Sequence, residues 1–298
     1  MIGSHPSDRS FPLRLHPAFN AVLPKKLRME AAVIPVVRLS GAIGMVSPLR
    51  PGLSLAAVAG PLERAFSVKA APAVAIIVNS PGGSPVQSAL IYKRIRALAE
   101  EKQKPVTVYV EDVAASGGYM LACAGDDIVA DPSSIVGSVG VISAGFGFDR
   151  AIDKLGIDRR VYTAGTRKMS LDPFQPEKTE DVRRLRALQR EVHQSFIDLV
   201  KERRGDVLTG EDKDLFNGEF WAGQTALTLG LIDRIGDLRS DMRARFGDKT
   251  VFKLFAQRRT LFGQRTAGGV TGEMPSLVSA DDWIGALEVR ALWQRYGL

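Results

Sequence analysis

The chain has 298 residues, 45% of them hydrophobic and 24% charged, with a formal net charge of +7. This composition is that of an ordinary globular protein and excludes disordered or collagen-like chains. A single cysteine, Cys123, excludes an intrachain disulfide, and no apolar run reaches the roughly 18–20 residues that span a bilayer. We therefore expect a cytoplasmic protein without a signal peptide or transmembrane segment.

Residues 1–30 are predicted to be a loosely ordered leader in which basic residues outnumber acidic ones. A basic leader is compatible with peripheral contact with an anionic membrane surface. Aromatic residues do not alternate with the charges and no nucleic-acid motif follows, so we expect no nucleic-acid partner. A solvated basic tail is the simpler interpretation.

From residue 31 to about 250, strand and helix patterns alternate along the chain. Nearly continuous apolar, β-branched runs are typical of strands covered on both faces, and apolar residues at helical spacing indicate amphipathic helices. This alternation predicts an α/β domain over 31–250 with a mostly parallel sheet. The expected strands are 31–41, 73–80, 105–113 and 159–165, and the expected helices are 85–103, 178–205 and one that begins at 117.

Residues 251–298 are predicted to form a linker followed by a helix. The stretch 263–276 is rich in glycine and contains a proline, which is typical of a linker. The stretch 280–298 places apolar side chains on one face of a helix, and we expect it to pack on its own domain or on a neighbouring subunit.

Two glycine-containing turns follow successive predicted strands. "NSPGG" (79–83) ends one strand, and "AASGG" (114–118) ends the next and contains Ser116. The carboxyl ends of parallel strands are where open α/β sheets place their sites, and backbone N–H groups there can bind an oxyanion. Each turn taken alone is also consistent with a plain strand-to-helix connection.

A catalytic Ser116 needs a base, because a serine hydroxyl is a weak nucleophile until its proton is removed. The chain has three histidines, and two of them lie in the leader. His193 falls within a polar helix, where a surface position is the better interpretation. A desolvated lysine is the remaining option. The loop 163–174 contains such a lysine, but composition alone does not select it.

The sequence contains no motif typical of a metal site or a nucleotide-binding site. HExxH, CxxC and the phosphate-loop pattern are absent from the sequence. Cys123 lies among alanines on a predicted helix, where we expect a small buried hydrophobe. We therefore expect no cofactor and no metal.

The order of several blocks between about 31 and 240 resembles the signal peptide peptidase A (SppA) family of serine–lysine peptidases. The blocks are "VIPVVRLSGAIG", "VNSPGGSP", the stretch 111–142, "AGTRKMSLDPF" and the stretch 215–238. The resemblance is to the short, single-unit form. It implies a ClpP/crotonase-like fold of repeated ββα units with flanking helices and a C-terminal helical extension.

The resemblance also implies roles for individual residues. Ser116 corresponds to the nucleophile and Lys168 to the general base, and Ser138 corresponds to a serine that orients that lysine. The oxyanion hole would consist of backbone N–H groups of Gly82, Gly83 and Gly117. The family's short members assemble into rings in which adjacent protomers supply the serine and the lysine of one site.

The resulting hypothesis is a serine endopeptidase that cleaves short or unfolded peptides, with signal-peptide remnants as one candidate substrate. One alternative is a crotonase-type acyl-CoA enzyme, which would share the fold and the oxyanion hole without a serine nucleophile. The other is a non-catalytic scaffold at a membrane surface, which would use the basic leader and the last helix.

Overall fold

The computed structural model describes residues 31–44, 46–47, 50–165, 167–256, 287 and 289–298. The leader 1–30 and the linker 263–276 lie outside these residues. The described elements, in chain order, are β1 Val33–Ser40, β2 Val46–Ser47, β3 Arg50–Pro51, α2 Leu55–Phe66, β4 Val74–Ser80, α3 Pro85–Lys102, β5 Val106–Ala115, α4 Gly117–Ala122, β6 Asp127–Ala130, β7 Ile135–Gly137, α5 Asp149–Lys154, α6 Thr179–Arg204, α7 Asp212–Leu215, β8 Phe220–Ala222, α8 Gly223–Thr228, β9 Arg234–Ile235, α9 Leu238–Phe246 and β10 Val251–Leu254.

The central sheet has the strand order β10-β1-β4-β5-β6-β9, and β7 pairs with both β5 and β8. All these pairs are parallel except β7 with β8. The predicted α/β class with a mostly parallel sheet is therefore confirmed. The sheet takes in β10, so it continues past residue 250, where the central domain was predicted to end.

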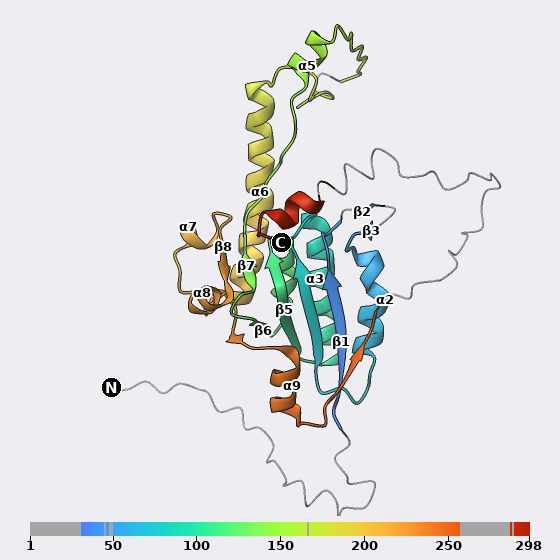
Figure 1. Cartoon of the computed structure of the whole chain (residues 1–298), viewed down its shortest axis with the longest axis vertical. Helices are drawn as coiled ribbons and strands as arrows, with labels where there is room; N and C mark the ends of the chain where they lie inside the picture. The colour runs from blue at the N-terminus through green and yellow to red at the C-terminus, as the bar shows by residue number, and fades with distance from the viewer. Residues whose placement is uncertain (1–30, 45, 48–49, 166, 257–286, 288) are drawn as a thin grey trace, which may run out of the picture.

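The sheet is buried on both faces, as continuous apolar strands require. One face packs against α2, α3, α4 and the inner part of α6, in a cluster that includes Leu62, Ile91 and Phe196. The other face packs against α9 through Met242. Figure 1 shows the strands side by side, with the carboxyl ends of β4 and β5 at the same edge. This edge holds both glycine-containing turns.

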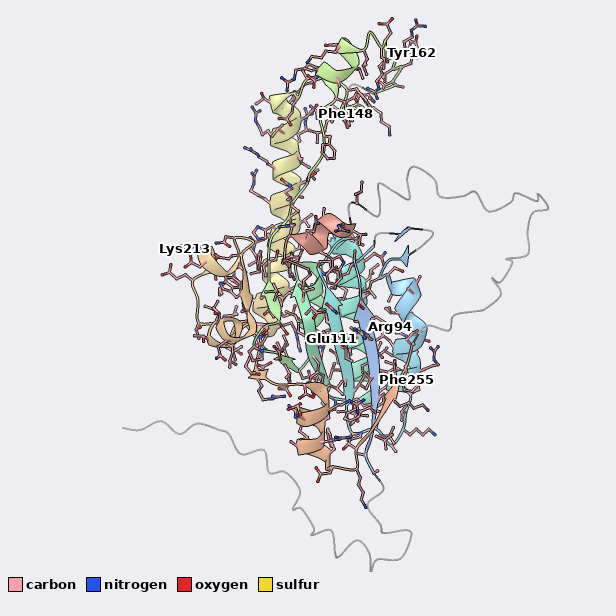
Figure 2. The ribbon with its side chains drawn as sticks, viewed as in Figure 1. Arg94, Glu111, Phe148, Tyr162, Lys213 and Phe255 are labelled. Atoms are coloured by element: carbon pink, nitrogen blue, oxygen red, sulfur yellow. The ribbon has the colours of Figure 1, made fainter. Side chains whose placement is uncertain are left out.

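Residues 142–165 and 167–190, which we call the arm, project from the body of the molecule. Figure 1 shows α6 running outward to a region that contains α5, and Figure 2 shows Phe148 and Tyr162 far from the sheet. The predicted strand at 159–165 is wrong, because its described residues form no strand. An extended segment needs a neighbouring strand to satisfy its backbone, and the arm offers none.

Candidate active site

Ser116 lies in a sharp turn between β5 and α4. Its backbone has φ 52° and ψ −122°, in the positive-φ half of the map that non-glycine residues rarely enter. The Ser116 N–H donates to the Gly137 carbonyl at 2.8 Å, and the Ser116 carbonyl accepts from Tyr119 N–H at 2.9 Å. These bonds hold a strained serine at the end of a buried strand, which is the backbone arrangement that displays a nucleophile.

The predicted oxyanion glycines surround this turn, but their N–H groups differ. Gly82 N–H donates to the Ser80 hydroxyl at 3.2 Å, so it is already engaged. Ile43 N–H donates to the Gly82 carbonyl at 2.8 Å, and Ile43 forms a parallel bridge with Gly83. In the described part of the chain, the N–H groups of Gly83 and Gly117 have no hydrogen-bond acceptor. These two are the donors that a ligand oxygen can use.

Close packing explains why glycines stand at these positions. A Cβ on Gly82 would lie 2.8 Å from Ser116 Cβ, so the two turns touch. A Cβ on Gly83, at φ 141°, would collide with the Ile43 carbonyl oxygen. A Cβ on Gly117 would collide with the Ser88 hydroxyl. Each glycine therefore allows an approach that a side chain would prevent.

Two residues that the sequence analysis did not single out hold the first turn. The register between β4 and β5 shifts after Val78, and the Asn79 side chain donates to Asp112 at 2.7 Å across this irregularity. Ser80 donates its hydroxyl proton to the Gly41 carbonyl at 2.7 Å while it accepts from Gly82. Both residues belong to the "NSPGG" stretch, which the sequence places at the end of a strand. Their hydrogen-bond partners are distant in the sequence, so only the three-dimensional structure reveals them.

A small pocket opens beside Ser116. Apolar side chains form most of its wall, with Met120 from α4 and Val192 and Phe196 from α6. The pocket is lined by Gly83, Pro85, Ser116, Gly117, Met120, Gly140, Val141, Val192 and Phe196. A narrow apolar pocket next to a serine hydroxyl and two free N–H groups suits the apolar side chain of an extended ligand.

Ser138 is linked to Ser116 by a backbone hydrogen bond at the preceding residue. It follows Gly137, whose carbonyl accepts the Ser116 N–H, and it also has a positive φ of 56°. Its N–H donates to the Glu219 carbonyl at 2.6 Å, and its hydroxyl accepts from Tyr296 at 3.2 Å. The structure thus brings together Ser116, Ser138 and the glycine turns.

Lys168 stands apart from this group. It lies exposed in a turn of the arm, where its N–H donates to the Gly165 carbonyl at 3.2 Å. Among the described residues no contact joins it to Ser116. His193 is partly buried, and its Nε2 lies 3.1 Å from the Val139 carbonyl oxygen, so the ring is engaged there. Among the described residues of one chain, neither Lys168 nor His193 forms a hydrogen bond with Ser116.

Cys123 is fully buried, as predicted, and burial raises the pKa of its thiol to about 12. Such a thiol is unreactive at neutral pH. In the described ranges no group of three or more His, Cys, Asp or Glu side chains could hold a metal ion. None of the described helices has both the length and the hydrophobicity that a bilayer-spanning segment requires.

Comparisons with known proteins find the model of "Peptidase family S49" over residues 98–250. The chain is 58% identical over 285 residues to a protein of Brucella abortus named Na(+)/H(+) antiporter NhaA, covering 93% of this chain and 38% of that protein. It is 31% identical over 217 residues to the chloroplastic serine protease SPPA of Arabidopsis thaliana, covering 67% of this chain and 32% of that protein. The chain therefore spans well under two thirds of either relative.

Among solved structures, the 1510-N membrane-bound stomatin-specific protease in complex with a substrate peptide is similar, with a TM-score of 0.46 and 15% identity. The match covers 78% of this chain and 94% of that one.

Proposed function

Because the chain belongs to peptidase family S49, we propose that it is a serine endopeptidase that cleaves short or unfolded peptides with Ser116 and Lys168. The observation that carries this proposal is the strained Ser116 turn, which faces the free N–H groups of Gly83 and Gly117. A hydroxyl held beside two unpaired donors at a sheet edge is suited to acyl transfer.

The proposed reaction uses these groups together with a Lys168 amine brought to Ser116. The Ser116 hydroxyl attacks the substrate carbonyl while the neutral Lys168 amine takes its proton. The N–H groups of Gly83 and Gly117 bind the negative oxygen of the tetrahedral intermediate. The lysine ammonium then donates this proton to the leaving amine of the substrate. The acyl group of the substrate stays on Ser116 as an ester. Water, deprotonated by the same amine, hydrolyses this ester.

We propose that Lys168 is supplied by a neighbouring copy of the chain in a homo-oligomer. The arm that carries Lys168 exposes large hydrophobic side chains, including Tyr162 at 91% and Phe146 at 80% exposure. Apolar surface of this extent on a projecting segment is typical of a protein interface. An arm that packs against a neighbour would lose water around its lysine, which favours the neutral amine.

The pocket beside Ser116 supports a substrate class. Met120, Val192 and Phe196 form an apolar wall next to the nucleophile. We therefore propose that the enzyme prefers an apolar residue before the cleaved bond. Such residues are buried in folded proteins, so this preference also favours unfolded segments and short peptides, with apolar signal-peptide remnants as one candidate.

Two single variants and their mixture test the proposal. Ser116→Ala and Lys168→Ala should each lower peptide hydrolysis by at least about 10⁴-fold, because both remove a group that takes part in bond making. If adjacent subunits share each site, equal amounts of the two inactive variants, mixed and allowed to exchange subunits, should recover about a quarter of native activity.

Native activity in either single variant would contradict the Ser–Lys assignment. If each variant is inactive and the mixture also stays inactive after exchange, the dyad is completed within one chain instead. Subunit exchange is verified by mass spectrometry of the intact assembly.

A further inference from the structure

The end of the described chain reaches the active-site edge of the sheet. Residues 289–294 are helical, and Tyr296 follows them with only 8% of its surface exposed. Figure 1 shows this segment, in red, near the upper ends of the strands and the inner part of α6. The Tyr296 hydroxyl donates to Ser138 Oγ at 3.2 Å in a buried contact. The helix predicted at 280–298 thus contacts a residue of the site.

The Tyr296 ring is held from several sides. It packs edge-on against Phe220, with ring centroids 5.0 Å apart and an interplanar angle of 74°. It also belongs to a buried cluster with Val113 and Ala115, against which Trp293 packs. Ala115 immediately precedes Ser116. Aromatic rings packed in this way have little rotational freedom, so the direction of the hydroxyl is fixed by the core.

The Ser138 side chain has fewer constraints of its own. Its backbone is fixed by positive φ and by the bond from its N–H to Glu219, but a serine hydroxyl can occupy three staggered rotamers. Among the described residues, the Ser138 hydroxyl has a hydrogen bond from Tyr296, and Ser138 is only 4% exposed. This hydrogen bond favours the rotamer of Ser138 in which it forms.

We propose that Tyr296 is a positioning residue of the active site, which holds the Ser138 hydroxyl where the Lys168 amine can bind it. This inference rests on the proposed Ser–Lys function. A hydroxyl oxygen accepts two hydrogen bonds, so Tyr296 leaves one position for an amine N–H. With an N–H directed at Ser138, the amine keeps its lone pair for the Ser116 proton.

The opposite effect of the same contact is also testable. If Tyr296 instead blocked the approach of Lys168 to Ser138, then removing the tyrosine hydroxyl would raise activity. The positioning role predicts a loss of activity, so the sign of the change separates the two.

The test uses Tyr296→Phe in the full chain, because phenylalanine keeps the ring packing and removes only the hydroxyl. We expect kcat to fall about 10- to 100-fold, the cost of a misplaced catalytic group, while KM and assembly size stay unchanged and Tm falls by a few degrees at most, because one buried hydrogen bond is lost. Labelling of Ser116 by a fluorophosphonate should slow in parallel. Tyr92→Phe is the matched control, because Tyr92 on α3 is also 8% exposed and lies outside the pocket.

A double variant shows whether Tyr296 acts through Ser138. Ser138→Ala combined with Tyr296→Phe should be no slower than Ser138→Ala alone, because the tyrosine then has nothing to position. The inference would be overturned if the fold loss of kcat in the double variant equalled the product of the losses in the two single variants. An unchanged or increased kcat in Tyr296→Phe would also overturn it. If Lys168→Ala is inactive while Tyr296→Phe is fully active, only this inference fails. If Lys168→Ala is active, the proposed function fails.

Discussion

The sheet edge that carries Ser116 is packed within the body of the chain, whereas the arm is largely exposed to solvent. At the edge, Ser116 and its neighbours sit among buried strands, and backbone hydrogen bonds of 2.6–2.9 Å fix the turns around them. The arm has a small cluster of its own, in which the ring of Phe148 lies 5.6 Å from that of Phe174 and Arg159 stacks on Phe174 at 4.8 Å. Around this cluster it exposes apolar side chains to solvent.

This difference is consistent with separate proposed roles, oxyanion binding at the sheet edge and delivery of the base by the arm. Oxyanion binding needs backbone groups placed to a fraction of an ångström, and a buried sheet edge provides such placement. A base needs a dry environment and a hydrogen-bonding partner, and an arm that docks on another subunit can bring it to a preformed site. The sheet edge thus depends on packing within one chain, whereas we propose that the arm depends on contact between chains.

Among the variants that test this contrast between the sheet edge and the arm, Gly83→Ala at the sheet edge has the largest expected effect. In Gly83→Ala, the new Cβ would collide with the Ile43 carbonyl oxygen, so the turn must shift and its N–H group must leave the site. We expect kcat to fall at least about 100-fold, the usual cost of losing one oxyanion donor. Steady-state kinetics on the purified assembly measures this loss.

Gly247→Ala is the control for Gly83→Ala. Gly247, which follows α9, also has a positive φ, of 97°, but a Cβ there would meet nothing within 4 Å. The control variant therefore suffers only the backbone strain, on the order of 1–2 kcal/mol of stability, and should keep most of its activity. Equal losses in both variants would show that strain, and not the clash at the oxyanion site, determines the effect.

Disturbing the arm should give a smaller and different effect. In Phe146→Ser, an 80% exposed aromatic becomes polar, which weakens a docking interface without altering the core of one chain. We expect the variant assembly to dissociate at a higher protein concentration than the native assembly does. Its specific activity should fall about 10-fold at low protein concentration. Activity should recover as concentration rises, because mass action restores the assembly. Light scattering and activity measured over the same dilution series test this.

Leu254→Ser on β10 is the matched control, because Leu254 is also a large exposed hydrophobic residue, at 61%, but lies away from the arm. It should leave both assembly and activity unchanged. A Phe146→Ser variant with native assembly size and concentration-independent activity would contradict the role of the arm.

The same contrast determines what the sequence could predict. The strands ending at Ser80 and Ala115, the helix at 85–102 and the glycine turns follow from local patterns, because burial on both faces leaves a continuous apolar run in the sequence. Ser116 and the candidate oxyanion glycines were proposed from these patterns and the family resemblance, and their roles stay predictions.

Features that depend on distant contacts were not predictable from local patterns. The stretch 159–165 contains Val161, Tyr162 and Thr163, residue types common in strands, but no strand lies beside it among the described residues of the arm. The contact between Tyr296 and Ser138 joins residues from distant parts of the chain, and a helical pattern does not reveal its partner. The hydrogen bond from the Gly82 N–H to the Ser80 hydroxyl likewise depends on the rotamer of Ser80, which the spacing of residues in the sequence does not determine.

The smallest effect is expected at the other end of the sheet, at Asp127 on β6. Burial alone would raise the pKa of this carboxyl, but Arg245, at 2.7 Å, and Arg234 outweigh it and hold the pKa below its usual value. A depressed pKa in the folded state stabilises the fold above the unfolded pKa of about 4, and this contribution is lost as pH falls through the folded value.

Asp127→Asn should therefore lower Tm by about 2–4 °C at pH 7, and the difference from the native chain should shrink steadily below about pH 4. Because Asp127 lies at the start of its strand, away from the carboxyl edge that holds Ser116, kcat should not change. Scanning calorimetry at several pH values and kinetics at pH 7 measure both effects. A Tm difference that stays constant down to pH 2.5 would show that the arginine pairing does not cause it. A lowered kcat would show that the two ends of the sheet are coupled, and the division between a rigid sheet edge and a separate arm would then have to include the whole sheet.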